Sequence, residues 1–419
     1  MGATVFSPTS DRLFIACGIG VFYQDAPPIA AGKYIYSITK GIRQLLPMSV
    51  KITPGGRVLI SCQDRAGTTF TRANSRQQMS RHAPDNLGAI AGNGIRQGSS
   101  MDHARDDENY LAMVYTAGSG NINGSVSTDG GVTWSGFPTN PTYVNGSGTT
   151  VPFLAGMIAI SNKLNMVWAS TNNNGGGSFL GGVKYTTDGG TTWASPNFSG
   201  TNMTGAMWHS AFYVRRQTLV ASKDTAGLFY IFCYGGGAGA DDLAQRGLWK
   251  STDGGANFTK TMSSFFMGAG VDYWANKLRL VPGNPGHLFW ASGQLSNYPA
   301  GPFANGLIFS ANDGATLTTL TGWSSPEDVA LGAAAPGASY PAIYVLGWRS
   351  GVFGLYRCID FNPASPTSCT WQLQEQWLLG HGEDDNVLAA DPTVFGRVVV
   401  GNRGGGGAVG DNIDIAHAT

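Results

Sequence analysis

Short runs of alternating apolar and polar residues recur along the chain, and turns rich in Gly, Asn or Pro separate them. Pairs of such runs occur in MIAISNKLNMVWAS (157–170), LVASKDTAGLFYIFCYG (219–235) and LRLVPGNPGHLFWASG (278–293). This alternation over strand length, with a turn between the runs, predicts antiparallel strand pairs. A helical pattern is convincing only in KGIRQLL (40–46). We therefore predict an all-β fold.

An eight-residue turn follows several of these strand pairs and returns roughly every 60 residues, as in repeat architectures. Its copies are STDGGVTW, TTDGGTTW, STDGGANF and the weaker SANDGATL, and their third positions are Asp129, Asp188, Asp253 and Asn312. A degenerate copy, RCIDFNPASPTSCTW, carries Asp360 and an insertion. Such an Asp accepts N–H bonds within its own turn, Gly permits positive φ, and the final aromatic residue covers the hairpin. We interpret this pattern, known as the Asp-box, as scaffold.

The number of strand groups predicts the closure of the fold. Eight groups occur, from a first at residues 11–25 to a last at residues 391–407. Because a ring of sheets has to hide its free edges, we predict that these two groups share one blade of a seven-bladed β-propeller. A single domain would then span residues 1–419, with a closing hairpin and linker (1–46), the main blades (47–384) and the closing strands (385–419).

Composition excludes several classes of partner. The 26 Lys and Arg residues balance the 26 Asp and Glu residues, so net charge favours neither nucleic acid nor an anionic membrane. No apolar run approaches the roughly 18 residues that span a bilayer, and we expect a soluble protein. No signal peptide is visible in the N-terminal residues, so we expect that the protein stays inside the cell, or that a leader has been cut away or lies upstream.

The five cysteines lack the spacing of a zinc site, and no nucleotide-binding motif is present, so we expect no metal and no cofactor. Cys358 and Cys369 bracket the insertion in the degenerate turn. They either form a disulfide in an oxidising compartment or stay reduced.

The C-terminal part of the chain resembles glycoside hydrolase family 74, the xyloglucanase family. The resemblance rests on GAAAPGASYPAIYVLGWRSGVFGLYR (332–357) and ADPTVFGRVVVGNRGGGG (390–407), and it extends back through GLWKSTDGGANF to SITKGIRQLLPMSVKITPGGRVLISCQDRAG (37–67). Members of that family pair two seven-bladed propellers across a cleft. This chain resembles the second propeller with the last hairpin of the first. The resemblance implies a secreted or periplasmic protein, a β-glucan polysaccharide as partner, and a second propeller domain or subunit.

The same resemblance implies a catalytic role for Asp64. Its segment SCQDRAG occupies the place of a G-D-I-G-G motif that holds the general acid, although Gln63, Arg65 and Ala66 depart from that motif. The motif of the first propeller, which would supply the base, has no counterpart here. Inverting hydrolysis needs two carboxyl groups roughly 6.5–9.5 Å apart, so this chain would carry half of the pair. A turn aspartate satisfied by backbone N–H groups is the alternative interpretation of Asp64.

Aromatic residues at the starts of inner strands are candidates for sugar binding, because ring faces cover the apolar side of a pyranose while polar neighbours bond its rim. Packing in the core is the alternative for each. These candidates are Trp208, His209, Tyr273, Trp274, Trp348 and Arg349. We interpret the remaining carboxylates as structural or solvated; they include Asp102, Asp106, Asp107, Glu327, Asp328 and residues 383–385.

Two functions from different classes follow. The first is a glycoside hydrolase-like propeller that acts on β-1,4-glucan of the xyloglucan type by inverting hydrolysis. The second is a non-catalytic propeller that binds a glycan or a protein, which the altered residues around Asp64 and the missing half of the pair favour. An exo-sialidase would need an Arg-Ile-Pro motif, and this sequence has none.

Overall fold

The computed structural model is almost entirely β-structure. It describes residues 4–6, 12–17, 20–25, 36–37, 47–62, 67–70, 95–117, 123–144, 148–170, 182–201, 217–233, 244–245, 247–262, 277–292, 306–376, 385–402 and 406–410. The predicted all-β class is confirmed. None of the helices in these ranges is long and apolar enough to cross a membrane.

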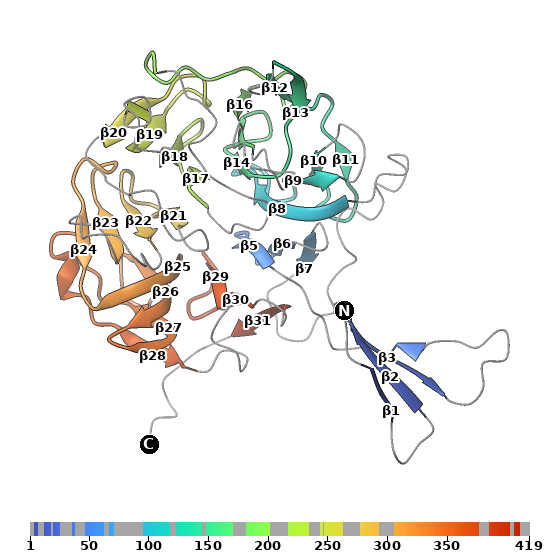
Figure 1. The fold of residues 1–419 in the computed structure, drawn as a ribbon. Coiled ribbons are helices and arrows are strands. Elements are labelled where there is room, and N and C mark those ends of the chain that lie inside the picture. The colour runs from blue at the N-terminus through green and yellow to red at the C-terminus, as the bar shows by residue number, and fades with distance from the viewer. Residues whose placement is uncertain are drawn as a thin grey trace, which may run out of the picture.

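Seven sheets of the described part surround a common axis (Figure 1). Each is an antiparallel meander of consecutive strands. They consist of β5 (Pro47–Ile52), β6 (Val58–Cys62) and β7 (Gly67–Phe70); β8 (Ile95–His103), β9 (Leu111–Ala117), β10 (Gly124–Ser127) and β11 (Ser135–Gly136); β14 (Met157–Ile160), β15 (Met166–Ala169) and β16 (Val183–Thr186); β17 (Leu219–Ala221), β18 (Phe229–Cys233), β19 (Gly247–Ser251) and β20 (Thr259–Met262); β21 (Lys277–Leu280), β22 (Leu288–Ala291), β23 (Leu307–Ser310) and β24 (Thr318–Leu320); β25 (Trp323–Ala334), β26 (Pro341–Arg349), β27 (Val352–Cys358) and β28 (Gln372–Glu375); and β29 (Asp385–Ala390), β30 (Val398–Asn402) and β31 (Gly406–Gly410). A separate hairpin joins β12 (Thr142–Val144) to β13 (Thr150–Pro152).

The first strand of each sheet is its inner strand. These strands contact one another in the order β5, β8, β14, β17, β21, β25 and β29, and β29 contacts β5 again, so they form a closed ring. The hydrophobic core lies between neighbouring sheets; one cluster joins Val167 and Ala169 of β15 to Phe229 and Ile231 of β18. This radial arrangement is that of a β-propeller.

The repeated turns have the hydrogen bonds that the sequence predicts. In the first of them, Ser127 Oγ donates to Asp129 Oδ1 at 2.7 Å, and the backbone N–H groups of Val132 and Thr133 donate to the same oxygen at 3.0 and 2.9 Å. The indole of Trp134 is buried and donates to the carbonyl of Gly131. Equivalent bonds surround Asp188, Asp253 and Asn312.

Each turn also packs on the sheet that precedes it in the ring. In the third turn Gly255 has φ +94°, and a Cβ there would lie 2.5 Å from Cγ2 of Val167 in β15. Gly is therefore required at this position by backbone conformation and by space. The turn is also bonded to the loop between the first two strands of its own sheet, since Gly254 N donates to the carbonyl of Gly227 at 3.0 Å. We call the end of the ring that carries these turns the turn end.

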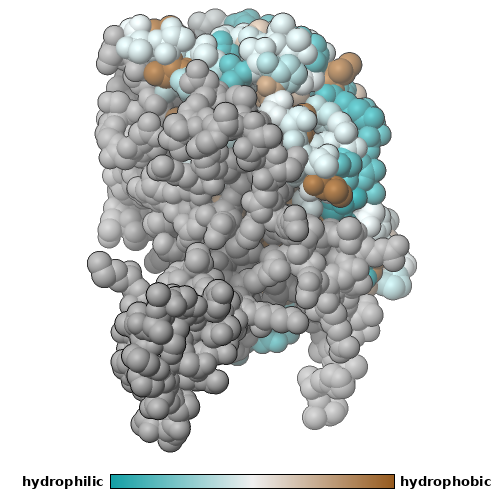
Figure 2. All heavy atoms as spheres, turned by 90° about the vertical axis from the view of Figure 1, so that its right-hand side faces the viewer, coloured by the Kyte–Doolittle hydropathy of each residue, from teal (hydrophilic) through white to brown (hydrophobic). Residues whose placement is uncertain are grey.

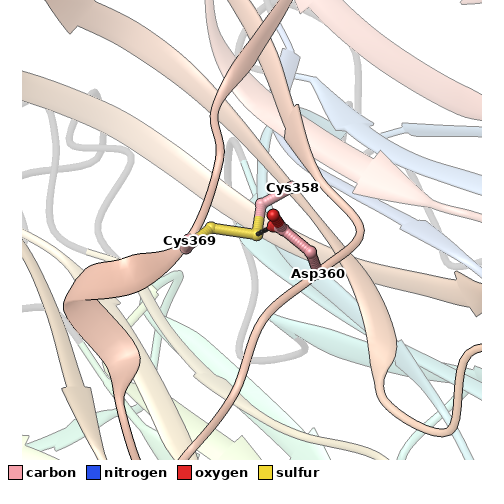
Figure 3. A group of neighbouring side chains, drawn as sticks. All are labelled: Cys358, Asp360 and Cys369. Atoms are coloured by element: carbon pink, nitrogen blue, oxygen red, sulfur yellow. Dashed lines mark hydrogen bonds between the residues drawn. A yellow bond between two sulfur atoms is a disulfide. The ribbon is translucent and has the colours of Figure 1, made fainter.

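The degenerate turn is closed by a disulfide between Cys358 and Cys369 (Figure 3). Asp360 Oδ1 accepts the N–H of Thr370 at 2.9 Å across the insertion, which contains the 3₁₀ helix η2 (Pro366–Ser368). Potential ligand atoms of the two cysteines and Asp360 lie within 4.8 Å of one another, as in a metal site. The sulfurs are bonded to each other, however, and this disulfide leaves neither thiolate to bind a metal.

The first and last segments do not share a blade. Strands β1 (Thr4–Phe6), β2 (Arg12–Cys17), β3 (Gly20–Asp25) and β4 (Tyr36–Ser37) pair only with one another among the described strands, in a sheet that stands apart from the ring (Figure 1). Because β1 and β4 occupy both edges of the β2–β3 hairpin, that hairpin has no edge left for the last strands. The ring closes by packing of β29 against β5, which corrects the predicted closure.

One side of the molecule is shown in Figure 2. In its described part, hydrophobic residues form small separate spots among hydrophilic ones. Isolated apolar residues are normal on protein surfaces, and they mark no docking patch on that part of this side.

Candidate functional site

Most of the predicted site residues lie outside the described residues. These are Asp64, Trp208, His209, Tyr273 and Trp274. The strands that flank Asp64 are described, and β6 ends at Cys62 before β7 begins at Gly67. All residues of β6 are buried, so this strand belongs to the core. The catalytic role of Asp64 stays a prediction.

Trp348 and Arg349 end β26, directly before the turn into β27. The indole of Trp348 is 43% exposed and lies beside the ring of Phe353, with a centroid distance of 5.6 Å. The guanidinium of Arg349 lies over Gly322, about 3.5 Å from where a Cβ of that residue would be. An exposed indole next to a half-buried arginine has the composition of a sugar-binding platform.

Trp348 and Arg349 precede the connection from β26 to β27, and Asp64 belongs by its sequence position to the connection from β6 to β7. Both connections join the second strand of a sheet to its third strand, whereas the repeated turns join the third strand to the fourth. In an antiparallel meander these two kinds of connection lie at opposite ends. The candidate sugar-binding end is therefore opposite to the turn end.

The loop carboxylates occupy two different environments. Asp107 pairs with Lys163 at 2.9 Å near the surface, as expected for a solvated turn. Asp328 is instead fully buried, and its oxygens accept bonds from Arg279 at 2.9 and 3.1 Å and from the N–H groups of Val329 and Leu388. The expectation of a solvated side chain at Asp328 is wrong, because its segment is part of the inner strand β25 and the carboxylate is bonded to both neighbouring sheets.

A cavity of about 370 Å³ lies on the axis of the ring. Residues from all seven inner strands line it, together with loops that follow these strands at the turn end. Most of the lining is apolar, with side chains such as Val50, Leu219 and Leu388. Its volume is within the range of small-molecule sites.

Charged side chains are concentrated on one part of the cavity wall. Asp102 is 1% exposed and forms ion pairs with two lysines. Lys51 Nζ lies 2.8 Å from Oδ1, and Lys223 Nζ lies 3.0 Å from Oδ2. The backbone N–H of Ile160 also donates to Oδ2 at 2.8 Å. These partners come from β5, from the segment after β17 and from β14, so one carboxylate of β8 joins three other sheets.

The electrostatics of this cluster favour one protonation state. Burial alone would raise the pKa of Asp102, but Lys223 and Lys51 hold that pKa far below its usual range. Burial lowers the pKa of the neighbouring His103 to about 4, and Lys223 acts in the same direction. At neutral pH Asp102 is thus a carboxylate and the imidazole of His103 is neutral.

The sequence analysis missed this cluster. Lys51 is a single charge within SVKITP, and Lys223 follows LVAS, so each interrupts or ends an apolar inner strand. A lysine at such a position is a signal of a buried partner. The identity of that partner depends on which strands become neighbours in the ring.

Comparison with curated proteins finds xyloglucanases. No family model matches the chain. It is 26% identical to a xyloglucanase from Acetivibrio thermocellus over 316 residues, which are 75% of this chain and 30% of that protein. It is 25% identical to a xyloglucanase from Paenibacillus over 287 residues, 67% of this chain and 22% of that one. The chain spans less than a third of the length of these relatives.

Solved structures show the fold. The xyloglucanase of glycoside hydrolase family 74 from Xanthomonas campestris superposes with a TM-score of 0.68 at 22% identity, over 98% of this chain and 50% of that one. A family 74 enzyme from Niastella koreensis gives 0.63 at 22% identity, over 95% of this chain and 47% of that one. The chain therefore has a β-propeller fold like that of these enzymes and matches about half of each.

Proposed function

We propose that the chain is a glycoside hydrolase propeller that acts on a β-1,4-glucan of the xyloglucan type. The proposal rests on the similarity of the chain to curated xyloglucanases, the first of which matches 75% of its length. The structural match to about half of each family 74 enzyme supports the further step that a second propeller, as domain or subunit, completes the site.

In this proposal Asp64 is the general acid of an inverting mechanism. It donates a proton to the leaving glycosidic oxygen, while a carboxylate outside this chain activates the water on the opposite face of the sugar. A general acid has to hold its proton at the working pH, which burial against the bound sugar would favour. If Arg65 pairs with Asp64, it favours the ionised carboxylate and so opposes proton donation. Substrate binding would then have to separate the two side chains.

Trp348 contributes a stacking surface to the same end of the ring. Its indole is 43% exposed although it belongs to a strand whose preceding residues are buried, and an exposed indole offers an apolar face to a pyranose ring. Arg349 beside it supplies donors for sugar hydroxyl groups. Trp208, His209, Tyr273 and Trp274 complete the proposed glucan-binding surface.

A second candidate is a non-catalytic propeller that binds glycan. The replacement of the family motif by Gln63, Arg65 and Ala66 favours it, because these changes alter the surroundings of the one proposed catalytic carboxyl group. The aromatic surface would serve this function equally well.

The test is release of reducing ends by the purified chain from xyloglucan, mixed-linkage glucan and carboxymethylcellulose. Asp64→Asn is compared with Asp106→Asn, which changes an exposed turn carboxylate. Release that disappears in Asp64→Asn but not in Asp106→Asn supports the hydrolase. Inversion is tested by NMR, which identifies the anomer of the sugar that is released first. Because the proposed base lies outside this chain, release is also measured after a first propeller of a family 74 enzyme has been joined to it. Binding of xyloglucan without release in both forms favours the second candidate. Neither release nor binding overturns both.

A further inference from the structure

The axial cavity has no part in the proposed glucan site. Its charged residues lie at or beyond the ends of inner strands, as Lys51 does near the end of β5, Asp102 near the end of β8 and Lys223 after β17. The glucan-binding candidates Trp348 and Arg349 belong to the opposite end. A ligand in the cavity would therefore contact the turn end of the ring.

The two lysines of the cavity differ in how many of their donors are used. The Nζ of Lys223 donates to Asp102 Oδ2 and to the carbonyls of His103 and Ile160, which accounts for all three of its N–H groups. The Nζ of Lys51 has one partner among the described residues, Asp102 Oδ1 at 2.8 Å. Its side chain keeps 29% exposure. Two donors of Lys51 are thus available on the cavity side.

The negative charges of the cavity wall do not fully balance the positive charge of Lys51. Lys223 neutralises Asp102, and Arg279 neutralises the buried Asp328. Asp224 lines the cavity but is exposed, and its carboxylate accepts the N–H of Gly283 at 2.7 Å. One positive charge therefore remains on Lys51 in a largely apolar enclosure, where an ammonium group is stabilised by a partner anion.

A buried polar atom in the same cavity also lacks a partner. The side chain of Gln217 is 6% exposed and lines the cavity. Its Nε2 donates to the carbonyl of Met48 at 3.4 Å, and no described residue donates to its Oε1. A buried amide oxygen is normally hydrogen-bonded, and a ligand donor could bond this one after a rotation of the Gln217 side chain towards the cavity.

We propose that the axial cavity binds a small oxyanion, a carboxylate or phosphate group carried by a compact polar molecule, with Lys51 as its principal contact. The oxyanion accepts the two remaining donors of Lys51, in charge-assisted bonds stronger than neutral ones. The Asp102 and Lys223 pair holds Lys51 in place. A hydroxyl of the same molecule can donate to Gln217, and the apolar wall covers its carbon skeleton.

The test is isothermal titration of the purified chain with inorganic phosphate, with glucuronate and with neutral glucose. We expect phosphate or glucuronate to bind and glucose not to bind, and the preferred anion distinguishes a phosphate from a carboxylate ligand. In Lys51→Gln, affinity should fall about tenfold or more, as expected when a hydrogen bond to a charged group is lost. Lys51→Arg should restore it, and Lys163→Gln, which changes a 47% exposed lysine outside the cavity lining, should leave it unchanged.

A second measurement needs no variant. Bound anion should slow acetylation of Lys51 in the wild-type chain, as measured by mass spectrometry, and should not slow acetylation of the exposed Lys163. Absence of binding by either anion, or binding without protection of Lys51, overturns the proposal. Neither result depends on xyloglucan hydrolysis, so this site and the glucan site succeed or fail separately.

Discussion

Asp129 and Asp102 are both carboxylates with many hydrogen bonds, but they obtain them in different ways. Burial would raise the pKa of Asp129, yet bonds from Thr133 and Ser127 hold that pKa below its usual value, and all of these partners lie within four residues. The partners of Asp102 are Lys51, Ile160 and Lys223, far away in the sequence. One carboxylate is satisfied by its own turn, whereas the other is satisfied only after four sheets have assembled.

This comparison predicts that Asp102 is the more important residue for stability. Asp102→Asn leaves two lysines without a counter-charge in the ring interior, and we expect a loss of about 3–5 kcal/mol in the free energy of unfolding. Urea unfolding measures it. Asp107→Asn, which breaks a surface pair with Lys163, is the matched control and should cause no measurable loss. Equal effects of the two changes would contradict the distinction.

The same cluster predicts loss of stability in acid. The folded-state pKa of His103, about 4, is below its unfolded value of 6.5, so the unfolded chain binds the proton first as pH falls. The contribution of His103 to stability is complete above pH 6.5 and is lost towards pH 4, and the lowered pKa of Asp102 extends the decline to lower pH. Melting temperatures between pH 7.5 and 4 measure the effect. In His103→Gln the curve should be flatter between pH 6.5 and 4; an unchanged curve would assign the decline to other groups.

The contact between a turn and the preceding sheet predicts a smaller effect. Gly255→Ala places a methyl group 2.5 Å from Val167 at φ +94°, and we expect a loss of about 1–3 kcal/mol in the free energy of unfolding. Gly283 has φ +71°, but a Cβ there would meet no atom within 4 Å, so Gly283→Ala reports the backbone strain alone. Urea unfolding of both variants separates packing from strain. Identical losses would show that packing against Val167 contributes nothing.

The smallest effect is expected for the turn carboxylate itself. Asp129→Ala removes bonds within an exposed turn, where water replaces them, so the expected loss in the free energy of unfolding is about 1 kcal/mol. Urea unfolding checks this value, and Asn312 provides a comparison because the fourth turn keeps its bonds with an amide at this position. Asp129→Asn should therefore be milder than Asp129→Ala. A loss as large as that of Asp102→Asn would show that the bonds within the turn contribute as much to stability as the bonds between sheets.

The candidate site was predictable to different extents. Trp348 was selected from its position between strands, and its exposed indole agrees with that choice. Asp328 was expected in a solvated loop but lies buried against Arg279, because the inner strand β25 begins earlier than its polar residues indicate. The lysines of the axial cavity were not selected at all. Their partner Asp102 is adjacent to neither in sequence, and no local pattern records that pairing.

The sequence by itself determined the strand pairs and the repeated turns, since alternation of apolar residues and hydrogen bonds within four residues are local properties. Only the tertiary structure decided how the ring closes and what lies on its axis. Packing of β29 against β5 replaced the predicted shared blade, and the same closure brought Lys51, Asp102 and Lys223 together. The physical reason is that contacts between inner strands join residues far apart in the chain, and their geometry is set by the whole ring.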